Sequence, residues 1–265
     1  MTTAHRMMVM GDPHSHPDYD NDRFEVAGEF ALQQQVDSVV CMGDWFDYAS
    51  LCKHSTRKSR EGSRVVAETQ HGQDALRRFM APFTAHARAR KRGLDRVAPA
   101  CHLILGNHDV RPDLIASDDP SLEGAVATDR YDAHINHGWT LHPFKEVVTL
   151  RSIAFCHYMA SGVMGRPVGG AQAALLAKNL LIKGHQSTIV GHDHRYGHAK
   201  VERWDGTKLH GWSAGCFTHP RYREAWCAQT EPMWDRGLLL LDLHPESDEV
   251  LSHAWVSARS LGLTS

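Results

Sequence analysis

Residues 102–110, HLILGNHDV, decide the fold. Apolar residues fill most of the first half of this stretch, the run stops at Gly106, and Asn107, His108 and Asp109 follow in succession. A short apolar run bounded by glycine is typical of a buried strand. All three polar side chains can bind a metal ion or exchange a proton. The stretch therefore predicts a buried strand that ends in a chemically active loop, provided that other strands supply partners.

Four further short apolar runs are built in the same way, each with a polar cluster directly after it. They are residues 6–10, 36–42, 152–156 and 187–190. Helical patterns with apolar residues on one face lie between some of the runs, at 22–35, 72–92 and 170–182, and Pro82 predicts a kink or a break in the second. This alternation predicts an α/β sheet, in which ligand sites gather at the carboxyl ends of the strands.

The last quarter of the sequence has a different pattern. The stretches KLHGWSA (208–214), GLLLLDLH (237–244) and EVLSHAWV (249–256) read as strands without long helices between them. We therefore expect an antiparallel second part packed on the first, within an α/β (α+β) fold. No linker divides the chain, which favours a single domain over residues 1–265.

The composition narrows the class of protein. The formal net charge of −2 produces no overall field that would attract nucleic acid or a membrane surface. Twenty histidines favour metal chemistry, since histidine is the commonest metal ligand.

The six cysteines form no C-x-x-C pair and suit free thiols in a reducing compartment. Without a signal-peptide pattern or an apolar run of membrane-spanning length, we expect a cytoplasmic protein with no membrane partner. The sequence makes no prediction of oligomeric state.

Polar residues of the types that can bind metals follow all five predicted strands. In chain order they are Asp12 and His14; Asp44 and Asp47; Asn107, His108 and Asp109; His157; and His192 and His194. Backbone capping at turns explains such residues one at a time but not the ordered series. Carboxylate, imidazole and amide ligands without thiolate suit manganese, iron, cobalt, nickel or zinc. An aspartate that bridges two such ions would complete a centre for in-line displacement at phosphorus.

The ordered series Asp-x-His, Gly-Asp-x-x-Asp, Gly-Asn-His-Asp, a later His and Gly-His-x-His, within residues 11–194, resembles the calcineurin-like metallophosphoesterases. The resemblance implies a four-layer sandwich of two central mixed β-sheets flanked by helices. It also implies two divalent metal ions, with manganese expected and iron, nickel, cobalt or zinc as alternatives. By the family pattern the first ion is held by Asp12, His14, Asp44 and His194, and the second by Asp44, Asn107, His157 and His192.

The resemblance also implies roles for residues that do not bind metal. His108 faces the substrate phosphate as a general acid or hydrogen-bond donor, Asp47 pairs with it, and Asp109 braces the loop. Local capping is the alternative for the two aspartates. Tyr48 follows Asp47, where serine/threonine protein phosphatases of the superfamily have a phosphate-binding arginine. Other cations must then bind the phosphate, and the candidates are Arg166, Arg195 and the basic segment 53–64.

The sequence resembles the phosphodiesterase and repair-nuclease branch more than the protein phosphatases. The leading hypothesis is a phosphoesterase that hydrolyses phosphodiesters, in a nucleotide or nucleic acid, by direct attack of a metal-bridging hydroxide. One alternative is a DNA or RNA nuclease that holds a strand with the basic segments 53–64 and 88–96, which otherwise read as solvated surface. A phosphomonoesterase is another alternative. A non-catalytic scaffold is disfavoured because His108 and every ligand are present.

Overall fold

The computed structural model describes residues 4–53, 55–56, 58–89, 98–126, 129–223 and 227–264. The strands are β1 (His5–Met10), β2 (Ser38–Cys41), β3 (Ala100–Ile104), β4 (Thr140–His142), β5 (Val148–Leu150), β6 (Ile153–Cys156), β7 (Ala160–Ser161), β8 (Arg166–Pro167), β9 (Thr188–Val190), β10 (Tyr196–Glu202), β11 (Lys208–Ala214), β12 (Gly237–Leu243) and β13 (Val250–Ser257). The α-helices are α1 (Asp22–Gln33), α2 (Val65–Ala89), α3 (Arg111–Asp118), α4 (Glu123–Val126), α5 (Asp132–Asn136) and α6 (Ala173–Gly184). Short 3-10 helices are η1 (Ala49–Leu51), η2 (Lys58–Arg60), η3 (Pro120–Leu122), η4 (Glu231–Met233) and η5 (Ala258–Leu261).

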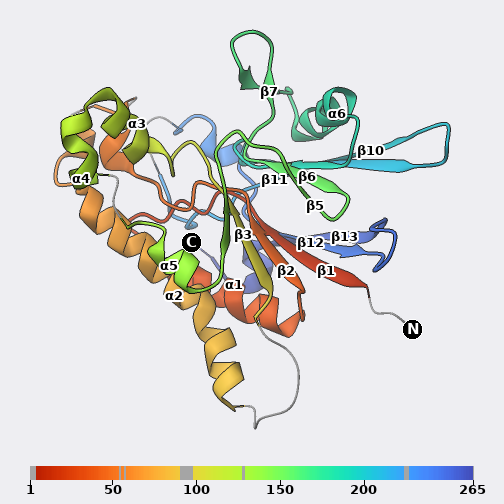
Figure 1. Ribbon diagram of the computed structural model, residues 1–265, viewed down its shortest axis with the longest axis horizontal. Coiled ribbons are helices and arrows are strands. Elements are labelled where there is room, and N and C mark those ends of the chain that lie inside the picture. The colour runs from red at the N-terminus through yellow and green to blue at the C-terminus, as the bar shows by residue number, and fades with distance from the viewer. Residues whose placement is uncertain are drawn as a thin grey trace.

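Two mixed sheets form the centre of the fold. Across the described residues, one sheet has the order β13-β12-β1-β2-β3-β4 and the other β10-β11-β9-β6-β5, while β7 and β8 form a small hairpin. In the first sheet β1 to β4 are parallel, and β12 pairs antiparallel with β1. Helices α1 and α2 cover the outer side of the first sheet, and α6 covers the outer side of the second (Figure 1). The fold is the four-layer sandwich that the resemblance implied.

Alternating side chains of β1 explain the layers. Met8 and Met10 pack into the core beneath α1 and α2, whereas Met7 and Val9 pack into the core between the two sheets. A strand buried on both faces reads as an unbroken apolar run, as RMMVM does. A third core lies between α6 and the second sheet and includes Leu176. Three apolar cores therefore separate four layers.

The five predicted strands are confirmed as β1, β2, β3, β6 and β9, and the three predicted helices as α1, α2 and α6. Helix α2 begins earlier than predicted and continues past Pro82 rather than breaking there. Strands β4, β5 and β10 were not predicted, because they are short or carry polar residues.

The last quarter was expected to form an antiparallel second part packed on the first; its antiparallel pairing is confirmed, but its place outside the first part is wrong. Strand β11 pairs parallel with β9 inside the second sheet, while β12 and β13 extend the first sheet beyond β1. The reason is burial on both faces of β12. Leu238 points into the core beneath the helices, and Leu239 and Leu241 point into the core between the sheets. Such a strand is stable only when it is covered on both sides.

His134 of α5 is a buried histidine whose ring nitrogens make no hydrogen bond with the described residues. Its side chain is fully buried, with the edges of the Trp45 and Trp139 rings against it at centroid distances of 4.9 and 5.5 Å. Burial lowers the pKa of His134 to about 3, so the ring is neutral in the folded protein at pH 7.

We expect His134→Leu to stabilise the protein, by about 1–3 kcal/mol at pH 7, because it removes an unsatisfied buried polar group. Because the folded-state pKa lies below the unfolded value of about 6.5, the wild type loses stability as the pH falls from about 6.5 to about 3. At pH 4.5 this loss is about 3 kcal/mol, and the variant escapes it. Urea unfolding at both pH values measures the difference, with the exposed His137→Leu as control. The same pH dependence in wild type and His134→Leu would contradict the assignment.

Candidate metal centre

The predicted ligands come from the carboxyl ends of strands in both sheets. Asp12 follows β1, Asp44 follows β2 and Asn107 follows β3 in the first sheet, while His157 follows β6 and His192 follows β9 in the second. Carboxyl ends of parallel strands meet at one edge of a sheet, and here the corresponding edges of the two sheets face each other. The chain therefore gathers these side chains at the interface between its sheets.

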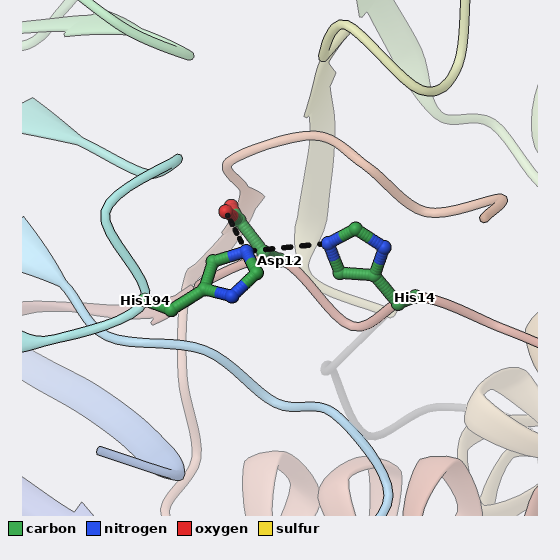
Figure 2. A group of neighbouring side chains, drawn as sticks. All are labelled: Asp12, His14 and His194. Carbon is green, nitrogen blue, oxygen red and sulfur yellow. Dashed lines mark hydrogen bonds and ion pairs between the residues drawn. The ribbon is translucent and has the colours of Figure 1, made fainter. Parts of the chain in front are cut away.

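The first group of ligand atoms consists of Asp12, His14 and His194, whose atoms all lie within 4.8 Å of one another. The Nε2 atom of His194 lies 3.0 Å from Asp12 Oδ2 and 3.3 Å from His14 Nε2. Figure 2 shows Asp12 and His14 on the loop after β1 and His194 on a second loop, with dashed lines from His194 to both others. Two imidazole nitrogens and one carboxylate thus face a common point.

The second group consists of Asp44, His157 and His192. Asp44 Oδ2 lies 3.4 Å from His157 Nε2, and that nitrogen lies 2.9 Å from Asn107 Oδ1. Asp44 Oδ2 also lies 3.7 Å from His14 Nε2, which belongs to the first group. The Asp44 carboxylate therefore stands between the two groups, as a bridging ligand would.

The residues present fit divalent cations. Asp12 Oδ1 is buried and has no hydrogen-bond partner within the described part of the chain, and a buried charged oxygen without a partner is costly unless a cation binds it. The donors are carboxylate, imidazole and amide oxygen, which suit ions of intermediate hardness. Asp12, His14, Asp44 and His194 would hold one ion, and Asp44, Asn107, His157 and His192 would hold the other.

Four of these ligands lie on strained backbone. The φ angles of His14, Asp44, His192 and His194 are 42°, 52°, 66° and 60°. This left-handed region is uncommon for residues other than glycine, and each such residue costs on the order of 1–3 kcal/mol. Strain of this kind is typical of functional sites, where the surrounding structure holds a side chain in a required direction. No sequence signal predicted this conformation, because none of the four is glycine.

Two glycines give the carboxylates room. A Cβ atom on Gly106 would lie 2.1 Å from Asp44 Oδ1, and one on Gly191 would lie 2.4 Å from Asp12 Oδ1. Both distances are far shorter than any van der Waals contact. The glycines that end the apolar runs before the third and fifth clusters are therefore required by close approach to the metal-binding aspartates.

The charges of the site favour cation binding. Burial acts to raise the pKa of the Asp44 carboxyl, but the His157 and His108 rings outweigh burial and hold that pKa well below its ordinary value. Burial also opposes protonation of His157, yet Asp44 raises the pKa of His157 to about 10. Burial and the neighbouring His157 lower the pKa of His192 to about 4. Since metal ligands must be deprotonated, His157 would have to lose its proton to hold a cation.

A comparison with protein families agrees with this geometry. The model of the family described as calcineurin-like phosphoesterase matches residues 5–196 of the chain. The chain belongs to the calcineurin-like phosphoesterase family. A search of curated proteins found no match. As a member of this family the protein is a metal-dependent phosphoric ester hydrolase, and the matched region contains every predicted metal ligand.

His108 lies among the predicted metal ligands of this phosphoesterase, but the family pattern does not include it in either ligand set. Its Nδ1 lies 2.8 Å from Asp47 Oδ1, and the same carboxylate oxygen lies 3.1 Å from His14 Nδ1. Burial acts to raise the pKa of Asp47, but the two histidines hold that pKa well below its ordinary value. An ionised Asp47 accepts a hydrogen bond from Nδ1 of each ring. These bonds leave Nε2 of His14 facing the other atoms of the first ligand group and Nε2 of His108 facing the cleft.

Two residues near His108 were missed by sequence reasoning. The Tyr222 hydroxyl donates to Asp47 Oδ2 at 2.9 Å. Arg111 Nη2 lies 3.0 Å from His108 Nε2, and Arg111 Nη1 donates to the carbonyl oxygens of Asp47 and Tyr48. Arg111 stands three residues after His108, so its position beside the motif was a usable signal. Tyr222 lies too far along the chain for any spacing rule to connect it.

Asp109 ties two loops of the phosphoesterase together. Its Oδ1 accepts from the backbone of Phe46 at 3.0 Å, and its Oδ2 accepts from the backbone of Gly106 at 2.9 Å. Burial and the nearby Asp44 raise the pKa of Asp109 to about 7. These bonds hold the loop after β3 against the loop after β2, so they fix Asn107 and His108 relative to Asp44.

The ligand groups open onto a cleft of about 840 Å³. Asp44, His108 and His192 line it, together with Arg111 and Arg195. The Arg195 guanidinium makes two bonds to Asp193, at 2.7 and 2.8 Å. Arg166 is exposed on β8 and is not among the described residues that line the cleft, so its role in substrate binding stays a prediction.

The two basic segments are only partly described. Lys53 pairs with Asp118 of α3 at 2.8 Å, and Cys52 lines the cleft, so segment 53–64 begins at the rim of the cleft. Residues 54 and 57 and most of segment 88–96 lie outside the described residues. No helix in the described part of the phosphoesterase is long and apolar enough to span a membrane.

Proposed function

We propose that this phosphoesterase hydrolyses phosphodiesters with two divalent cations, expected to be manganese. The observation that carries the proposal is the Asp44 carboxylate, which lines the cleft and has Oδ2 3.4 Å from His157 Nε2 and 3.7 Å from His14 Nε2. When bound, two such ions supply Lewis acidity and activate water to attack phosphorus directly at neutral pH.

The chain's own residues supply proton transfer and orientation. In its imidazolium form His108 donates the Nε2 proton to the leaving oxygen and becomes the neutral ring, while Asp47 holds Nδ1 at 2.8 Å. Tyr222 in turn fixes Asp47. Arg111 is the cation next to His108 Nε2 and binds the phosphate oxygens. Arg195 and Arg166 stay assigned to substrate on sequence grounds, with Arg195 the nearer to the cleft.

The shape of the cleft supports a diester over a monoester. The residues that line it include a polar set, with His108 and Arg111, and an aliphatic set, with Met159, Pro167 and Val168. A diester has two substituents and would place one against each set, whereas a monoester has only one. The six described cysteines are all buried free thiols, which supports a reducing, cytoplasmic location.

Hydrolysis by manganese-loaded protein tests the proposal. The substrates are bis-p-nitrophenyl phosphate, p-nitrophenyl phosphate, and single-stranded and duplex oligonucleotides, with chelator-treated protein as the control. We expect kcat/KM to be higher for the diester than for the monoester, and activity to disappear without metal. A higher value for the monoester would replace the proposal with a phosphomonoesterase, and cleavage of oligonucleotides alone would replace it with a nuclease. Stoichiometric metal without any turnover would leave a non-catalytic protein.

A further inference from the structure

The cleft has an aliphatic wall that metal binding and proton transfer do not use. Six side chains build it: Met159, Pro167, Val168, Leu176, Leu180 and Val190. Four of them, Val168, Leu176, Leu180 and Val190, belong to the core between α6 and the second sheet, and Met159 packs against that core. Leu176, Leu180 and Val190 are almost fully buried, so Met159, Pro167 and the edge of Val168 form the part of the wall that faces the cleft.

This wall is continuous with the second ligand group. Val190 ends β9 two residues before His192, and Cys156 of the same core ends β6 directly before His157. A phosphate bound beside His157 and His192 would thus have an aliphatic surface next to it for one ester substituent. Burying an aliphatic group there is favourable, since both surfaces leave water.

Few positively charged side chains line the cleft beside the aliphatic wall. Among the described residues that line the cleft, the arginines and lysines are Arg111 and Arg195. Arg195 is held by Asp193 and by the carbonyl oxygens of Gly170 and Ala171. A nucleic-acid strand requires several phosphate contacts along a basic groove, together with aromatic faces for its bases. Two arginines, one of them already paired, do not make such a groove.

The aromatic residues of the cleft are engaged with ligand histidines. Tyr158 lies against His192 at a ring-centroid distance of 5.1 Å, and Trp234 meets His194 edge-on at 4.1 Å. The rings therefore brace the metal ligands. The lining also includes an aliphatic set, with Met159, Pro167 and Val168, which suits a flexible hydrocarbon better than a hydrogen-bonding base.

From this wall we infer that the substrate is a compact phosphodiester in which one ester substituent is an aliphatic chain of several carbons. The inference rests on the proposed phosphodiesterase function and specifies its substrate class. The aliphatic substituent lies along Met159, Pro167 and Val168, and the leaving group lies toward His108 and Arg111.

A homologous series of substrates tests the inference. Methyl, butyl and hexyl p-nitrophenyl phosphate share one leaving group and differ only in the retained chain. We expect kcat/KM to rise roughly threefold to fourfold for each methylene that enters the wall. In Val168→Asn and Met159→Gln the rise should flatten. The control is Val163→Asn, at a fully exposed position on the adjacent hairpin that does not line the cleft, and it should keep the full rise.

Binding of hexyl phosphate and methyl phosphate to the manganese-loaded protein, measured by calorimetry, gives a readout independent of turnover. Hexyl phosphate is expected to bind more tightly in the wild type and to lose this advantage in Val168→Asn. If all three esters are hydrolysed equally well, the inference is wrong and the phosphodiesterase function stands. If no ester is hydrolysed, the proposed function fails, and equal binding of the two phosphates would then also overturn the inference. Faster cleavage of an oligonucleotide than of the hexyl ester would overturn it as well.

Discussion

Replacing Asp44 with asparagine is expected to lower kcat/KM for bis-p-nitrophenyl phosphate by roughly 10³-fold or more. Asparagine keeps an oxygen that can accept from the backbone of His108, as Asp44 Oδ1 does at 2.8 Å. It loses the charge that stands between the two ligand groups. Elemental analysis should show that the variant binds less manganese than the wild type.

Thermal unfolding separates this loss from misfolding. Wild-type protein should gain about 2.7 kcal/mol of stability at a manganese concentration one hundred times Kd, and the variant should gain less. Asp242→Asn is the matched control, since Asp242 pairs with Arg6 on the first sheet and contacts no predicted ligand. Wild-type metal content together with wild-type activity in Asp44→Asn would remove Asp44 from the centre.

Replacing His108 with alanine is expected to lower kcat by roughly 10²–10⁴-fold through loss of the general acid. Manganese content should be unchanged, because the family pattern places His108 outside the ligand set. The loss should be smaller for a p-nitrophenyl ester than for an alkyl ester, since a weakly basic leaving group needs less protonation. Tyr222→Phe, which removes the bond to Asp47, should lower activity by about 10–100-fold.

Leaving-group dependence distinguishes proton transfer from metal binding at His108. His108 also lies in a group with His14 and Asp44 whose ligand atoms are within 4.8 Å of one another. If His108→Ala loses manganese, and loses activity equally on aryl and alkyl esters, then His108 binds metal and the general acid is another residue.

Much of the candidate site could be predicted because its chemistry is local. Asp12 stands two residues after β1, and His192 two residues after β9. An apolar run, a glycine and a metal-binding side chain follow one another at these points, so both the strand and its ligand can be recognised together. The layers of the sandwich follow from the same runs, because strands without polar alternation must be covered on both faces.

The contacts that could not be predicted join distant segments. Tyr222 reaches Asp47 from 175 positions away, and Trp234 reaches His194 across a further loop. Neither residue has a local pattern that distinguishes it from an ordinary core aromatic. The left-handed backbone of His14 and Asp44 is likewise hidden, because tertiary contacts impose it against the local preference of these residues.

The misplacement of β12 was avoidable. Its run GLLLLDL has leucines at adjacent positions, which indicates a strand covered on both faces rather than one with a solvent side. The prediction of an antiparallel partner was sound, since β12 is antiparallel to β1 and to β13. The error lay in giving these strands a layer of their own.

The pairing of β1 with β12 has a consequence for synthesis on the ribosome. Met10 pairs with Leu238, so one edge of β1 stays open until more than two hundred further residues have been translated. At about 5–20 residues per second, that delay is roughly 10–45 s. During this time a nascent strand as apolar as RMMVM exposes unpaired backbone, and such an edge invites aggregation. The first sheet therefore cannot be completed until β12 has been synthesised.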